Sequence, residues 1–154
     1  MNSVGETFDD SRNESLAKKR VREANAELAK ANINVTSFDG IVLLTGQVSS
    51  ADLIPIASAQ VAPLRNVRKV HNELTVAGKT SYLSRTNDSW LTTKVKSAMA
   101  AAESADSTRI KVVTENGVVY LMGLVTREEA DAAADIARHI QGVQKIVKVF
   151  EYMN

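Results

Sequence analysis

Apolar and polar residues recur along the chain with two different periods, and these periods predict its secondary structure. A period of three to four residues predicts helices over 13–32, 49–64, 90–102 and 126–140. Alternation, or a short β-branched run, predicts strands over 33–38, 41–48, 66–76, 109–114, 118–125 and 143–152. Because Pro55 and Pro63 interrupt the second helical pattern, we expect that helix to start late, kink or be short. Residues 1–12 show neither period, which indicates a disordered tail.

The pattern occurs twice in the same order. The segment G-I-V-L-L-T-G-Q-V at 40–48 matches G-V-V-Y-L-M-G-L-V at 117–125, and N-V-R-K-V at 66–70 matches G-V-Q-K-I at 142–146. Asp39-Gly40 and Asn116-Gly117 stand between paired strand patterns, as two-residue hairpin turns do. The repeat predicts two tandem units, 13–77 and 89–154, joined by a linker at 78–88.

Each unit has the order α-β-β-α-β, which predicts an α+β fold with two helices packed on one face of a three-stranded mixed sheet. Gly46 lies inside a predicted strand, and Gly123 is its counterpart in the second copy. A glycine at such a position indicates a bulge or a close approach of two backbones. Neither glycine precedes a helix as a phosphate-binding loop requires, so both are interpreted as structural.

This order, with the strand glycine in V-x-L-x-G-x-V, resembles the BON (bacterial OsmY and nodulation) domain. Further similarity lies in N-D-S-W-L-T-T-K-V-K-S at 87–97, T-E-N-G-V-V-Y-L-M-G-L-V-T at 114–126 and A-D-I-A at 134–137. With two copies, the chain is similar to the dual BON-domain outer-membrane lipoproteins, the division- and outer-membrane-stress-associated lipid-binding proteins. The resemblance covers about residues 13–153 and is stronger in the second unit.

The resemblance implies a periplasmic protein that is anchored to the outer membrane through a lipidated N-terminal cysteine. It implies binding to anionic phospholipids, such as phosphatidylglycerol and cardiolipin, at the inner leaflet of the outer membrane. It further implies concentration at division sites and support of envelope integrity, with envelope proteins as possible partners. The chain has no cysteine, and residues 1–15 contain no apolar signal segment, so we expect the native protein to carry both ahead of this sequence.

The helix that opens the second unit carries the candidate site, because it holds Trp90, the single tryptophan. A helical wheel places Leu91, Val95, Ala98 and Ala102 on the core side. The candidate lipid-binding residues are Trp90, Thr93, Lys94, Lys96, Ser97, Ala100 and Ala101. An indole favours the headgroup region of a bilayer, lysine is attracted to anionic lipid, and small residues permit close approach. The resemblance implies lipid binding on this same helix.

Two alternatives remain open for this helix. A tryptophan in the first turn can pack as a hydrophobic staple on the preceding segment, in which case Trp90 is structural. An exposed Trp90 can also be the centre of a protein–protein interface, which makes the chain an interaction or scaffold module. A solvent-exposed indole would argue against the hydrophobic staple. Binding that depends on anionic lipid would argue against the protein–protein interface.

Composition excludes several classes of function. A net charge of +1 from 19 basic and 18 acidic residues, with no basic stripe, argues against nucleic-acid binding. His71 and His139 stand alone, without the spacing of metal ligands. A cluster of acidic residues on one predicted helix could suggest cation binding, but it is interpreted as favourable first-turn charges and a solvated face: Glu128, Glu129, Asp131 and Asp135. No pairing of nucleophile and base can be proposed, so we expect neither catalysis, nor a cofactor, nor a metal.

Overall fold

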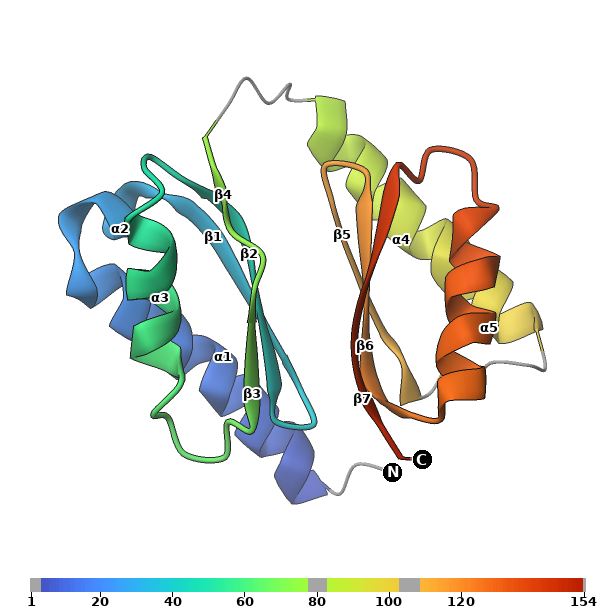
Figure 1. The fold of residues 1–154 in the computed structure, drawn as a ribbon, viewed down its shortest axis with the longest axis horizontal. Coiled ribbons are helices and arrows are strands. Elements are labelled where there is room, and N and C mark those ends of the chain that lie inside the picture. The colour runs from blue at the N-terminus through green and yellow to red at the C-terminus, as the bar shows by residue number, and fades with distance from the viewer. Residues whose placement is uncertain (1–3, 78–82, 103–108, 154) are drawn as a thin grey trace. The chain divides into compact units, whose positions relative to one another are not determined.

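The computed structural model describes residues 4–77, 83–102 and 109–153, and it divides the chain into two compact units (Figure 1). Unit 1 spans Met1–Lys79 and unit 2 spans Thr80–Asn154. In each unit, helices cover one face of a small mixed sheet. The predicted α+β class and its twofold repetition are therefore confirmed.

Unit 1 is built on the central strand β2, which pairs antiparallel with β1 and parallel with β3 and β4. Its elements are α1 (Val4–Ala24), α2 (Ala26–Lys30), β1 (Asn32–Phe38), β2 (Ile41–Val48), α3 (Leu53–Val61), β3 (Lys69–Asn72) and β4 (Thr75–Val76). Side chains that alternate along β2, such as Val42 and Leu44, form the core with Val21 of α1 and Ala57 of α3.

Unit 2 repeats this arrangement around β6, which pairs antiparallel with β5 and parallel with β7. Its elements are α4 (Leu83–Ala101), β5 (Lys111–Glu115), β6 (Val118–Val125), α5 (Arg127–Arg138) and β7 (Lys145–Tyr152). Val119 and Leu121 of β6 pack with Val95 of α4, Ala133 of α5 and Phe150 of β7. Val119 and Leu121 therefore lie on the face of the sheet that the helices cover.

The strand glycines hold conformations that other residues rarely adopt. Gly46 has φ +121° and Gly123 has φ +146°. A Cβ on Gly46 would lie 2.0 Å from the carbonyl oxygen of Asn32, on the neighbouring strand β1. The predicted close approach of two backbones is confirmed at Gly46.

Both hairpin turns also follow the prediction. Asp39 and Gly40 have φ of 54° and 78°, and Asn116 and Gly117 have φ of 53° and 78°. Positive φ at both central residues is the geometry that suits the twist of a two-residue hairpin. The turns set the register in which Phe38 opposes Ile41.

The first helix begins earlier than the sequence predicted. Because α1 starts at Val4, the part of the predicted disordered tail that the structure describes, 4–12, is helical. The reason is a buried carboxylate, which apolar periodicity does not reveal. Asp10 accepts hydrogen bonds from the Ser37 hydroxyl (2.8 Å) and from the backbone N–H groups of Asp39 (2.8 Å) and Gly40 (3.1 Å). Asp10 thereby ties α1 to the β1–β2 turn.

We expect Asp10→Ala to lower the free energy of unfolding by about 3 kcal/mol, because it leaves three donors without their charged acceptor. Chemical denaturation followed by circular dichroism measures this change. Glu23→Ala, at an exposed position of the same helix, is the control and should change stability by less than about 0.5 kcal/mol. A loss that small for Asp10→Ala would show that the carboxylate does not hold the turn.

Two further boundaries differ from the prediction, whereas the start of α3 agrees with it. The helix expected over 13–32 is interrupted at Asn25, whose side chain caps α2 by accepting the Glu27 N–H. α3 starts late, as expected, and Pro55 falls in its first turn, where no hydrogen bond is lost. The predicted linker is helical from Leu83, and 78–82 lie outside the described residues.

The third strand of unit 1 is divided into β3 and β4, where the sequence predicted one continuous strand. Asn72 causes the interruption. Its side-chain amide donates to the Ile54 carbonyl of α3 (2.6 Å), and its side-chain oxygen accepts the N–H of Leu74 (3.2 Å). Glu73 still donates its backbone N–H to the Leu44 carbonyl of β2 (2.9 Å), but Glu73 and Leu74 belong to neither strand, and β3 and β4 pair separately with β2.

The capping box of α5 is confirmed. Thr126 accepts the N–H of Glu129 (3.1 Å), and the Glu129 carboxylate accepts the N–H of Thr126 (3.0 Å). The same carboxylate pairs with Arg109, and Asp131 pairs with Lys148 of β7 at 2.9 Å. The acidic residues of α5 are therefore occupied by a helix cap and ion pairs, in line with their structural interpretation.

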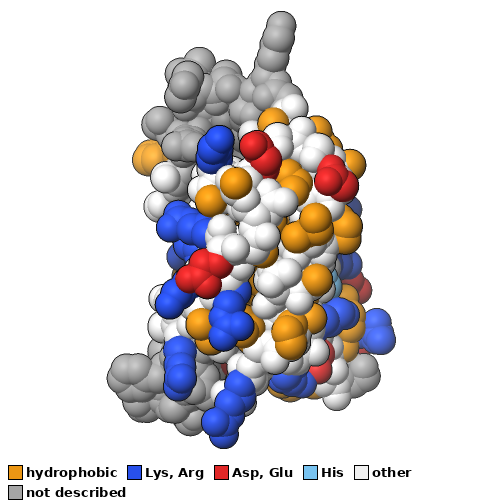
Figure 2. Space-filling model, turned by 90° about the vertical axis from the view of Figure 1, so that its left-hand side faces the viewer, with side chains coloured by type: hydrophobic (Ala, Val, Ile, Leu, Met, Phe, Trp, Pro, Cys, Tyr) orange, Lys and Arg blue, Asp and Glu red, His pale blue; other side chains and the backbone are white. Residues whose placement is uncertain are grey.

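The helix-covered face of unit 1 has an uneven charge distribution (Figure 2). Lys and Arg side chains follow its left-hand part and lower edge, while hydrophobic and uncharged side chains form a band on its right-hand part. The sequence explains both regions, because α1 contains Lys18, Lys19 and Arg20, whereas α3 contains no charged residue.

Candidate functional site

Helix α4 is fixed to unit 2 by one side only. Leu91, Val95 and Met99 are buried at intervals of four residues. The hydroxyl groups of Thr92 and Thr114 lie 2.5 Å apart and join the helix to β5. Leu91 and Val95 were expected on this side. Met99 was missed, although its spacing from Val95 is the signal that could have found it.

The side of α4 that faces away from the core carries Trp90. Its side chain is 63% exposed, the largest value among the exposed large hydrophobic residues that the structure describes. An indole packed as a staple would be mostly buried, so the structure does not support the staple alternative. A large exposed apolar side chain is a usual component of a surface that binds a partner or a membrane.

The remaining predicted residues lie on the same helix as this tryptophan. The Lys94 ammonium lies 5.7 Å from the centroid of the Trp90 ring, within reach of a cation–π interaction. Lys94 is half-buried, and the other members are exposed: Thr93, Lys96, Ser97, Ala100 and Ala101. Together with Trp90 and Lys94, these residues are called the Trp90 surface. The structure therefore places all seven candidate residues outside the buried stripe of α4.

The Trp90 surface is cationic and lacks carboxylates. Lys94 and Lys96 are the charged residues between Trp90 and Ala102, and no Asp or Glu occurs there. Lysines in these positions can approach an anionic membrane surface. Each then contributes about 1 kcal/mol to the free energy of membrane binding. The surface thus combines an interfacial aromatic ring with a local positive charge.

The corresponding face of unit 1 has a different composition. Asn13, Ala17 and Val21 of α1 are buried at intervals of four, as Leu91, Val95 and Met99 of α4 are. Aligning the two stripes places exposed Arg12 at the position of Trp90. It also places Lys19 and Glu23 at the positions of Ser97 and Ala101. The two units therefore share their core pattern and differ on this outer face.

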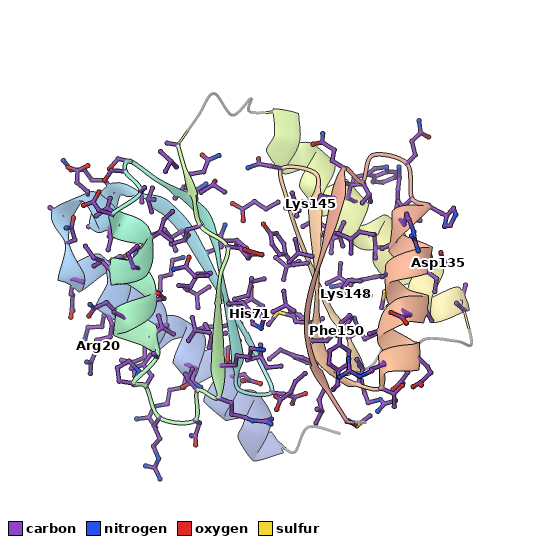
Figure 3. All side chains as sticks on the ribbon, in the orientation of Figure 1. Arg20, His71, Asp135, Lys145, Lys148 and Phe150 are labelled. Atoms are coloured by element: carbon purple, nitrogen blue, oxygen red, sulfur yellow. The ribbon has the colours of Figure 1, made fainter. Side chains whose placement is uncertain are left out.

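His71 lies in an environment that disfavours its protonated form. It lies on β3, next to Val70, which packs on the helix side of the sheet, so alternation directs His71 to the opposite side (Figure 3). Its Nε2 atom is buried and has no hydrogen-bond partner among the described residues. Burial, and secondarily the charge of Lys69, hold the pKa of His71 below its ordinary value of 6.5.

This lowered pKa predicts acid sensitivity. The unfolded chain binds the His71 proton more readily than the folded chain does, so the free energy of unfolding decreases as pH falls through 6.5 toward the folded-state pKa. We expect His71→Gln to reduce the decrease in thermal midpoint between pH 7.5 and pH 5.0. Equal decreases in both proteins would show that His71 titrates alike in the folded and unfolded chains.

No group of His, Cys, Asp or Glu residues in the described parts of the chain could hold a metal ion. None of the described helices is long and apolar enough to cross a membrane.

Comparison with known proteins adds the family. The BON domain model matches residues 9–78 and again residues 87–154. The chain belongs to the BON domain family. The predicted resemblance is thereby confirmed for both copies, and the matched segments begin slightly before the unit starts predicted at 13 and 89.

Several known proteins are similar over most of the chain. "Outer membrane lipoprotein DolP" of Haemophilus influenzae is 41% identical over 152 residues, covering 99% of this chain and 79% of that protein. "21 kDa hemolysin" of Actinobacillus pleuropneumoniae is 38% identical, covering 80% of this chain and 64% of that protein. "Osmotically-inducible protein Y" of Escherichia coli is 28% identical over 149 residues, covering 95% and 74%. The chain is thus a tandem BON protein similar to an outer-membrane lipoprotein.

Proposed function

We propose that this BON protein is a non-enzymatic, periplasmic phospholipid-binding protein of the Gram-negative envelope. It docks peripherally on anionic lipid of the outer-membrane inner leaflet through the Trp90 surface. The observation that carries the proposal is the 63% exposure of Trp90 beside Lys94 on a helix face without carboxylates. Similarity to an outer membrane lipoprotein supports the location.

In this mechanism, the indole inserts among the headgroups while its N–H remains hydrated. The lysines contact lipid phosphates, and Ser97, Ala100 and Ala101 let the helix lie close to the surface. Burial of the ring contributes about 2 kcal/mol, and the two lysines contribute about 1 kcal/mol each. A total of about 4 kcal/mol corresponds to a dissociation constant of about 1 mM.

Docking of this strength is reversible and needs a second attachment to persist. We propose that a lipid anchor on the native protein provides it, as the name of the Haemophilus influenzae relative indicates for that protein. The Trp90 surface then determines which lipids the tethered protein contacts. Support of outer-membrane integrity and localisation at division sites belong to the same proposal.

Intrinsic fluorescence tests the proposal directly, because Trp90 is the single tryptophan. Vesicles of phosphatidylglycerol should shift its emission to the blue, and vesicles of phosphatidylcholine should do so much less. Higher salt should weaken the shift, since the lysine contribution is screened. A shift of equal size with both lipids, or none with either, would contradict the proposal and favour a protein partner at the Trp90 surface.

A further inference from the structure

Unit 1 contains a groove that the sequence did not predict. It has a volume of about 420 Å³ and lies between α3 and the start of β3. Its apolar lining comes from both elements and the loop between them: Pro55, Ala59, Ala62, Val67 and Val70. Arg68 and Lys69 also line the groove and are exposed. The groove therefore has an apolar lining, with two cationic residues at its border.

The helix beside the groove is unusual for a surface helix. α3, Leu53–Val61, contains no charged residue, although Pro55 and Ala59 are exposed. Its counterpart α5 has the sequence R-E-E-A-D-A-A-A-D-I-A-R, in which six of twelve residues are charged. A solvated helix normally carries charged or polar residues on its outer face, as α5 does. The outer face of α3 has instead the composition of a contact surface.

The strand beside the groove has an open edge. Within the described residues, β3 pairs with β2 and with no strand on its other side. An edge strand presents backbone N–H and C=O groups that can pair with an added strand. Since Lys69 and Val70 are adjacent on β3, they point to opposite faces of the sheet. Val70 lies on the α3 side, where it packs against the core.

The charged residues within the segment 53–72, which supplies the lining of the groove, have one sign. No Asp or Glu occurs between Asp52 and Glu73, whereas Arg65, Arg68 and Lys69 all do. Such a segment attracts a negatively charged partner and disfavours a positively charged one.

We propose that unit 1 binds an extended, carboxylate-bearing peptide segment of another protein. The peptide adds as a strand to the open edge of β3. Its alternate apolar side chains enter the groove beside Val70 and Ala59, and its carboxylates lie on the other face beside Lys69. A concave groove next to a strand edge suits a peptide better than a flat bilayer, which offers no strand to pair. This binding does not depend on the Trp90 surface.

The probe is a synthetic seven-residue peptide of alternating Glu and Val, blocked at both ends, titrated into the isotope-labelled full chain. We expect amide shifts concentrated in 55–72, and none with the matching Lys–Val peptide. Lys69→Glu should weaken binding at least about 10-fold, since it replaces an attraction by a repulsion worth about 1.4 kcal/mol in total. Ala59→Glu, which places a carboxylate in the groove, should also weaken it.

The repeat offers a matched control. Lys145 is the first residue of β7, as Lys69 is the first residue of β3. Lys145 pairs with Val118 of β6, and Lys69 pairs with the equivalent Ile41 of β2. Lys145→Glu should leave peptide binding within about 2-fold, and Trp90→Glu should leave it unchanged. Equal shifts with both peptides, no shifts, or shifts at 55–72 with phosphatidylglycerol micelles alone would overturn the proposal. Because each surface has its own variant, failure here is distinguishable from failure of lipid docking.

Discussion

Replacing Trp90 by glutamate is expected to weaken binding to phosphatidylglycerol surfaces by about 100-fold, which corresponds to about 3 kcal/mol. About 2 kcal/mol is the loss of the buried indole. About 1 kcal/mol is the unfavourable interaction of a new carboxylate with anionic lipid. Amide shifts of the labelled protein during titration with phosphatidylglycerol micelles measure the effect. In the unchanged protein these shifts should be confined to 90–102.

The fold should survive this change, because the Trp90 side chain is 63% exposed and does not belong to the buried core cluster of unit 2. Trp90→Phe, which keeps an apolar ring, should retain most of the binding. Arg12→Glu is the matched control at the equivalent position of unit 1, and it should leave lipid binding within about 2-fold even though it changes the charge more. Unchanged binding by Trp90→Glu would place the docking surface elsewhere.

Replacing Gly46 by alanine is expected to cost about 4 kcal/mol or more, an exceptional loss for one methyl group. The added Cβ would lie 2.0 Å from the Asn32 carbonyl oxygen, and φ +121° is unfavourable for any other residue. The obstructing atom belongs to the backbone of β1, which cannot move without breaking its pairing with β2. A small domain has only about 5–15 kcal/mol of stability, so unit 1 should be largely destabilised.

Gly117→Ala separates this clash from simple loss of a glycine. Gly117 also has positive φ, +78°, but its Cβ would meet side-chain atoms of Gln144 at 3.0–3.2 Å. Because that side chain can move, we expect a cost of about 1–2 kcal/mol, mainly backbone strain. Denaturant unfolding of both variants measures the difference. Similar losses would mean that β1 moves away from Gly46 at little cost.

Local sequence patterns determined much of the fold. The apolar runs of β2 and β6, the turns at Asp39-Gly40 and Asn116-Gly117, and the spacing of Leu91 and Val95 are local features. A local feature can be recognised without knowing its partner. The same holds for the capping box at Thr126, whose two members are three residues apart.

Errors arose where a polar side chain bonds to a distant segment. Asp10 is polar and lies in a stretch without periodicity, yet it is buried against the β1–β2 turn. Asn72 ends β3 through a bond to Ile54, eighteen positions earlier. Neither partner can be identified from the residues around Asp10 or Asn72, so a disordered tail and an unbroken strand were the natural predictions.

The sequence by itself determined the two-unit α+β architecture, the helix that carries Trp90 and the difference between the outer faces of the two units. These features follow from the sequence repeat and from the spacing of apolar residues. Both can be recognised without knowing which elements contact one another. The tertiary structure alone decided that Trp90 is exposed, because exposure depends on what packs around the helix. It also created the groove between α3 and β3, whose lining residues meet only when the chain between Pro55 and Val70 folds back on itself.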